Sequence, residues 1–72
     1  MMKVPAVATI RKNVSRYAAM VGLRIDRNSD GSYNIHDTVI GYDAFTNVTM
    51  NWVVRTIYDS LAMQNAMASR TL

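Results

Sequence analysis

The sequence predicts a single α+β domain over residues 1–72, with two helices packed on one face of a small antiparallel sheet. Apolar residues recur at helical spacing near both ends of the chain, first over residues 7–21 and again over residues 50–61. Between these stretches, two short segments that alternate apolar and polar residues flank the turn-forming residues 28–31. The expected order is therefore helix, strand, strand, extended segment and helix.

The first helix is expected over residues 5–21. Pro5 suits the first helical turn, because its missing N–H has no intrahelical partner to lose there. Gly22 suits the left-handed position that follows the last turn of a helix. The apolar residues follow spacings of three and four, which place on one stripe Val7, Ile10, Val14, Tyr17 and Val21.

A β-hairpin is expected next, and its register follows from the side-chain pattern. A two-residue turn would set Ile25 opposite His36 and mix polar with apolar side chains on one face. A three-residue loop that ends with Gly31 in a left-handed bulge conformation instead pairs Ile25 with Ile35. The same register pairs Arg24 with His36 and Arg27 with Tyr33, and gives one buried face to Leu23, Ile25, Tyr33 and Ile35.

The pattern is weaker over residues 38–47, where Gly41 interrupts a run of apolar residues. We expect an extended segment there, with a short third strand as one alternative and a turn near Asp43. A second helix of roughly 20 residues should follow, ending near Ala68, with Thr46, Asn47 or Thr49 as its cap. Its inner face is predicted to carry Met50, Val53, Val54, Ile57, Tyr58 and Leu61.

Composition excludes several classes of protein. The chain has no cysteine, so disulfide frameworks, thiolate zinc sites and catalytic thiols are ruled out. It has no glutamate, one histidine and none of the common catalytic motifs, and we therefore expect no enzymatic activity and no cofactor. No apolar run is long enough to cross a membrane, and we expect a cytoplasmic protein. A core this small gains little stability alone, which favours a homodimer or larger homo-oligomer.

One polar pattern in the predicted hairpin resembles the calcium-binding loop of EF-hands and of dockerin repeats. Calcium requires six to eight oxygen ligands around a sharp turn at glycine, and Gly31 provides such a turn. The resemblance implies calcium ligands at Asp26, Asn28, Asp30, Asn34 and Asp37. The same residues also suit a bare hairpin loop, which is the interpretation we favour.

Basic residues are concentrated in the first third of the chain. Residues 1–27 hold six basic side chains against Asp26 alone, whereas residues 28–72 hold two basic and four acidic ones. This asymmetry favours an anionic partner, either nucleic acid or an acidic protein surface. The contact residues predicted on the helix and hairpin are Arg11, Lys12, Arg16, Arg24 and Arg27, with Lys3 as an extension.

The second helix carries a further apolar stripe away from its inner face. Trp52 could pack beneath Phe45 or the segment 39–42, or it could anchor an interface, because tryptophan is the most frequent hot-spot residue. The interface interpretation predicts contacts by Trp52, Thr56, Met63 and Met67. We therefore expect a small regulator or inhibitor that binds another protein, of a kind that suits a phage or mobile-element accessory protein. A nucleic-acid-binding regulator is the alternative.

Overall fold

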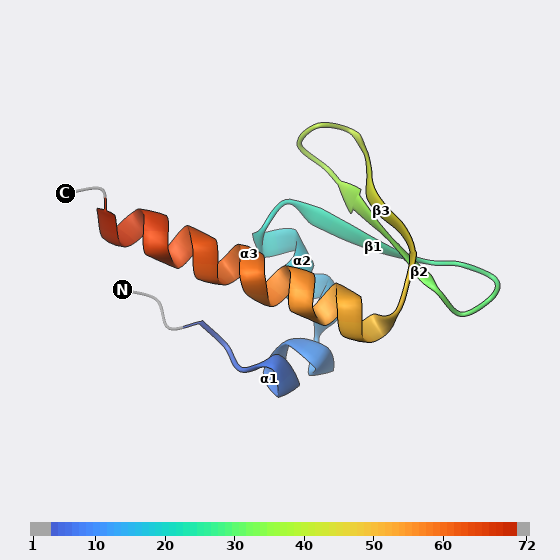
Figure 1. Ribbon diagram of the computed structural model, residues 1–72, viewed down its shortest axis with the longest axis horizontal. Coiled ribbons are helices and arrows are strands. Elements are labelled where there is room, and N and C mark those ends of the chain that lie inside the picture. The colour runs from blue at the N-terminus through green and yellow to red at the C-terminus, as the bar shows by residue number, and fades with distance from the viewer. Residues whose placement is uncertain (1–3, 71–72) are drawn as a thin grey trace.

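The computed structural model describes residues 4–70 and confirms the α+β class (Figure 1). Three helices accompany one antiparallel sheet whose strands lie in the order β1-β2-β3. Within the described part of the chain the elements are α1 (Val7–Lys12), α2 (Val14–Met20), β1 (Leu23–Arg27), β2 (Tyr33–Asp37), β3 (Tyr42–Val48) and α3 (Met50–Arg70).

The core lies between the helices and the first two strands. α1 packs against α3, α2 packs against β1, and α3 also contacts β2. The side chains buried among the described residues are Ile10, Ala18, Ile35, Val53, Val54, Ile57 and Leu61. β3 lies at the edge of this arrangement and is exposed along all of its residues except Val48.

The single helix expected over residues 5–21 is wrong, because the chain forms two helices that meet at Asn13. This residue leaves the helical conformation, with φ −149° and ψ 64°. The break allows α1 to pack against α3 while α2 packs against β1, which one straight helix could not do. As a result Val7, expected on the buried stripe, is exposed, and Ala18 takes a place in the core.

The hairpin prediction is confirmed in register and in loop type. Ile25 pairs with Ile35, Arg24 with His36 and Arg27 with Tyr33. The Gly31 amide donates to the Asn28 carbonyl, and Gly31 has φ +87°, the left-handed conformation that the bulge requires. Ile35 is fully buried, and the other apolar residues of this face pack against the core.

The expected Gly22 helix end is also confirmed. Gly22 follows α2 with φ +71°, and its amide donates to the Ala19 carbonyl. Its own carbonyl accepts from both the amide and the hydroxyl of Thr38, which ties the start of β1 to the end of β2.

A third strand is present, but it lies later in the chain than the predicted extended segment implied. Val39 and Ile40 occupy a tight turn in which both amides donate to the Asp37 carboxylate. Gly41 closes this turn with φ +86°, so β3 begins only at Tyr42, and Asp43 lies within the strand rather than in a turn. The pairing of β3 with β2 is irregular at two points, on either side of the Ile35–Phe45 pair.

The last helix is confirmed with Thr49 as its cap, since the Trp52 amide donates to the Thr49 hydroxyl at 3.2 Å. Four of its predicted inner residues are buried and two, Met50 and Tyr58, are partly buried against them. None of the side chains at residues 62–68 is buried, so this part of α3 extends past the core. No helix within residues 4–70 is both long and apolar enough to cross a membrane.

Candidate functional site

The polar residues of the β1–β2 loop form a hydrogen-bonded network within the hairpin. The Asn28 side-chain amide donates to the side-chain oxygens of Ser32, Asn34 and Asn47 at 3.0, 2.8 and 3.2 Å. The Asn34 oxygen also accepts from the backbone amide of Asn47, which has φ +56°. The network therefore joins the β1–β2 loop to the end of β3.

The three aspartates of the calcium-like pattern have separate partners. Asp30 accepts from the Ser32 hydroxyl and amide, and these bonds lower the pKa of its carboxyl. Asp26 pairs with Arg24, which lowers the pKa of Asp26 and raises that of Arg24. Asp37 holds the β2–β3 turn. No three His, Asp or Glu side chains gather within residues 4–70, so the pattern is used for hairpin and turn contacts in this structure.

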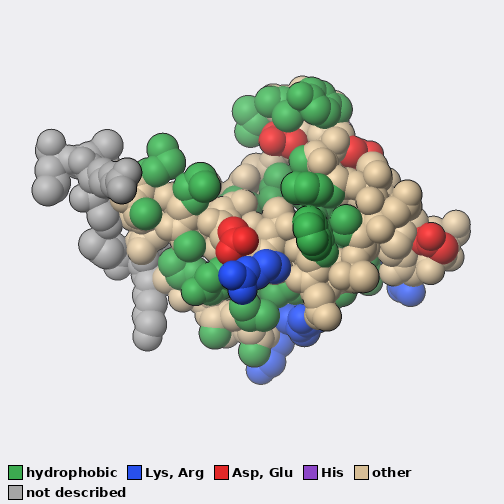
Figure 2. Space-filling view, in the orientation of Figure 1, with side chains coloured by type: hydrophobic (Ala, Val, Ile, Leu, Met, Phe, Trp, Pro, Cys, Tyr) green, Lys and Arg blue, Asp and Glu red, His purple; other side chains and the backbone are tan. Residues whose placement is uncertain are grey.

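The predicted basic surface is divided between two parts of the molecule. Arg11 and Lys12 lie in the last turn of α1, and Arg16 lies on α2, where its guanidinium stacks 5.8 Å from the Tyr17 ring centre. Arg11 also donates to the Asn51 side chain at 2.7 Å and so links α1 to α3. In Figure 2 basic side chains lie at the lower edge, over α1.

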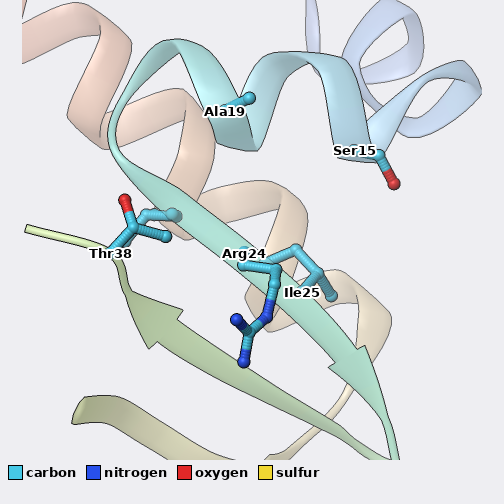
Figure 3. Close-up of a pocket in the computed structure, with 6 residues that line it drawn as sticks. Ser15, Ala19, Arg24, Ile25 and Thr38 are labelled. Carbon is cyan, nitrogen blue, oxygen red and sulfur yellow. The ribbon is translucent and has the colours of Figure 1, made fainter. Parts of the chain in front are cut away.

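The two hairpin arginines do not extend that basic surface as one unit. Arg24 makes a paired contact with Asp26, and Figure 3 shows its guanidinium pointing away from α2. Arg27 is exposed at the end of β1. Lys3 lies outside the described residues.

The apolar stripe predicted on α3 is interrupted by charge. Trp52 is 51% exposed, and Met63 and Met67 are also exposed near the far end of the helix. Asp59 follows Trp52 by close to two full helical turns, so it lies on the same stripe, where it pairs with Arg55 at 3.2 Å. Thr56 donates to the Trp52 carbonyl. The predicted interface is thus divided into a Trp52 part and a methionine part.

Trp52 belongs to a larger apolar surface that we did not predict as a site. Its ring contacts Phe45 edge-to-face, with 5.9 Å between ring centres, so it both packs on β3 and remains half exposed. We call the surface the β3 patch and define it by the exposed residues Val39 (83%), Ile40 (54%), Tyr42 (64%), Phe45 (42%) and Trp52. Figure 2 shows apolar side chains over the β2–β3 turn and below it, toward the start of α3.

The β3 patch lies in a region of the chain that contains no basic side chain except His36. No lysine or arginine occurs between Arg27 and Arg55. The nearby acidic residues are Asp37, at the turn, and Asp43, whose carboxylate lies 3.0 Å from Nδ1 of His36. Asp43 is thus the charged residue of β3 itself, while the nearest basic residues, Arg24 on β1 and Arg55 on α3, are each paired with an aspartate.

A pocket of about 310 Å³ lies between α2 and the edge of β1 (Figure 3). Its lining residues are Ser15, Ala19, Leu23, Arg24, Ile25 and Thr38. The Thr38 hydroxyl donates a hydrogen bond to the Gly22 carbonyl, and the Arg24 guanidinium donates to the Asp26 carboxylate. The pocket therefore does not bring together the polar groups that orient a small ligand.

Comparisons of the chain with protein-family models, with curated proteins and with solved structures give no match. Among the surfaces of this structure, the β3 patch combines the largest exposed apolar side chains with an adjacent strand edge.

Proposed function

We propose that this chain is a small non-enzymatic regulator or inhibitor that binds another protein through the β3 patch. The observation that carries the proposal is the exposure of apolar side chains on all three elements of the patch. These elements are the β2–β3 turn, β3 and the start of α3. The aromatic residues Tyr42, Phe45 and Trp52 together leave roughly 300 Å² exposed, given the 150–250 Å² that such side chains bury when enclosed.

This exposed area is large for a protein of 72 residues. The largest apolar patch on a typical monomer covers about 300–600 Å², and Val39 and Ile40 bring the β3 patch into the upper part of that range. Aromatic side chains in such patches supply most of the energy of protein interfaces. A single surface of this kind suits the accessory protein of a phage or mobile element, which is part of the same proposal.

Binding of nucleic acid through α1 and α2 is the second candidate function. The exposed basic residues Arg11, Lys12 and Arg16 favour it, because they could contact phosphates. Arg11 is partly committed to Asn51, however, and Arg24 is committed to Asp26. The Asp26 carboxylate therefore offsets the charge of Arg24, whereas Arg11 keeps its charge beside the neutral Asn51 amide.

The two functions are separated by capturing the tagged full chain with its partners from the native host, with and without nuclease. Val39→Ser with Ile40→Ser alters the β3 patch, and Lys12→Ala with Arg16→Ala is the matched variant of the basic surface. We expect the patch variant to lose its specific protein partner, and the basic variant to retain it after nuclease treatment. Loss of all partners on nuclease treatment, or loss only with the basic variant, would contradict the proposal.

A further inference from the structure

We infer that the free edge of β3 accepts an extended segment of the partner protein as a fourth strand, and that this segment alternates apolar with basic residues. The inference rests on the proposed function and specifies how the β3 patch is occupied. Strand addition is an established mode of peptide recognition, in which backbone hydrogen bonds give affinity and alternate side chains give specificity.

β3 has an edge that is open to pairing. Within residues 4–70 it has β2 as its only strand neighbour, and it is exposed from Tyr42 to Asn47. Proteins usually protect such an edge with lysine, proline, several charges or bulges, and of these β3 has only the irregular pairing with β2. β3 has neither lysine nor proline, and Asp43 is its only charged residue. By contrast, the opposite edge strand β1 carries Arg24, Asp26 and Arg27.

The shape of β3 favours a single flexible segment over the edge of another sheet. Its pairing with β2 shifts register on both sides of the Ile35–Phe45 pair. Such irregularities bend a strand and increase its local twist. An extended segment that is not already paired in a sheet can adopt that twist, whereas the flat edge of a preformed sheet cannot.

One face of the added strand would meet the apolar side chains of the β3 patch. Phe45 pairs with the buried Ile35, so it lies on the face of the sheet that the helices cover. The Trp52 ring, at the start of α3, packs edge-to-face on Phe45 and adds to the apolar surface on this face. Because alternate residues of a strand point to the same face, every second residue of the segment should be apolar.

The other face of the added strand would meet the Asp43 carboxylate. Asp43 pairs with His36, which places it on the face of the sheet opposite Phe45. Arg24 lies two strands away on this face and is paired with Asp26, so Asp43 is the charge nearest the open edge and attracts basic side chains. A second copy of β3 would bring another Asp43 to this region, so charge favours a basic segment of a different protein.

The probe for this inference is a displayed library of random nine-residue peptides, selected on the full-length chain. We expect the selected peptides to be enriched in Lys or Arg alternating with Val, Ile or Tyr, and depleted in Pro. The best peptide should bind at least tenfold more weakly when alternate backbone amides are N-methylated, because these amides pair with the strand edge. It should also slow hydrogen exchange of the β3 amides.

Two charge variants test the acidic contact with the selected peptide. Asp43→Asn should weaken its binding at least about fivefold, whereas Asp59→Asn removes the same charge from α3 and should leave binding unchanged. Failure of the library to enrich such peptides would overturn the inference, as would binding that tolerates N-methylation. A dimer that forms through β3 and dissociates on addition of the peptide would identify a second copy as the occupant and would also overturn it.

These outcomes are distinct from failure of the proposed function. If the library selects no strand-forming peptide but the patch variant still loses its protein partner, only the mode of binding is wrong. If peptides bind β3 as expected but the captured protein is indifferent to the patch variant, the proposed function is wrong.

Discussion

Replacing Val39 and Ile40 together by serine should weaken partner binding far more than its effect on stability explains. Complete burial of either side chain is worth about 1.5–3 kcal/mol. Because Val39 is 83% and Ile40 54% exposed, most of that free energy is still available to a partner. The exposed parts correspond to about 2–4 kcal/mol, or roughly 30- to 1,000-fold in dissociation constant.

The same substitutions remove only the buried parts of these side chains from the folded protein. This loss should lower the free energy of unfolding by about 1–2 kcal/mol, at about 4–8 °C of melting temperature for each kcal/mol. Ile57→Val is the matched control, because shortening a buried isoleucine costs about 0.5–1.5 kcal/mol at a site remote from the partner.

The assay combines thermal unfolding by circular dichroism with titration of the captured partner. We expect both variants to melt at similar temperatures and only the serine variant to lose binding. Equal binding by the two variants would show that Val39 and Ile40 do not contact the partner. Loss of more than about 3 kcal/mol of stability by the serine variant would also contradict the expectation, since the turn would then be part of the core.

Four further outcomes are expected. Gly31→Ala should lower the free energy of unfolding, measured by chemical denaturation, by about 1–2 kcal/mol, because φ is +87° at this position. The added Cβ would meet no atom within 4 Å, so the cost comes from the backbone conformation alone, and a cost near zero would contradict the bulge assignment. The pKa of Asp30 is lowered in the fold by Ser32, so its contribution to stability should be present near neutral pH and lost as the pH falls below about 4. Asp30→Asn should flatten that acid-side loss in pH-dependent melting curves, and an unchanged slope would exclude the contribution. Millimolar calcium should leave the melting temperature unchanged, whereas an increase abolished by Asp30→Ala would establish a calcium site. Sedimentation should detect self-association at micromolar concentration that Met63→Gln weakens, and a wild-type monomer of 8.1 kDa throughout would rule it out.

The hairpin could be predicted from the sequence because two local requirements agree there. Only one register keeps Ile25 and Ile35 on the same face, and only a residue that tolerates positive φ can complete the three-residue loop. The calcium-like pattern arises at the same place because asparagine, aspartate and glycine meet both needs. Sequence alone could not distinguish a calcium loop from a bare hairpin loop. In this structure the carboxylates of Asp26, Asp30 and Asp37 make contacts within the hairpin and the following turn.

The break at Asn13 could not be predicted from periodicity. Residues 7–21 keep their helical spacing across the break, and neither proline nor glycine marks it. The break follows from tertiary packing, because α1 and α2 rest on different elements.

Most of the β3 patch was missed for a related reason. Val39 and Ile40 are apolar without any periodic pattern, and such residues were assigned to an extended segment rather than to a surface. The available signal was their position between the Asp37 cap and Gly41, which predicts a turn with exposed side chains. Trp52 packs on Phe45, as one of its two interpretations predicted, and its half-exposed ring leaves the interface interpretation as a prediction.

The fluorescence of Trp52 tests the central claim most directly, because Trp52 is the only tryptophan in the chain. Its quenching by iodide should be measured in the free protein and in the complex with the captured partner, made with a partner fragment whose tryptophans are replaced. We expect that quenching of the half-exposed ring falls strongly in the complex and that its emission shifts to shorter wavelength. Quenching that stays unchanged on saturation with the partner would show that the β3 patch is not the binding surface.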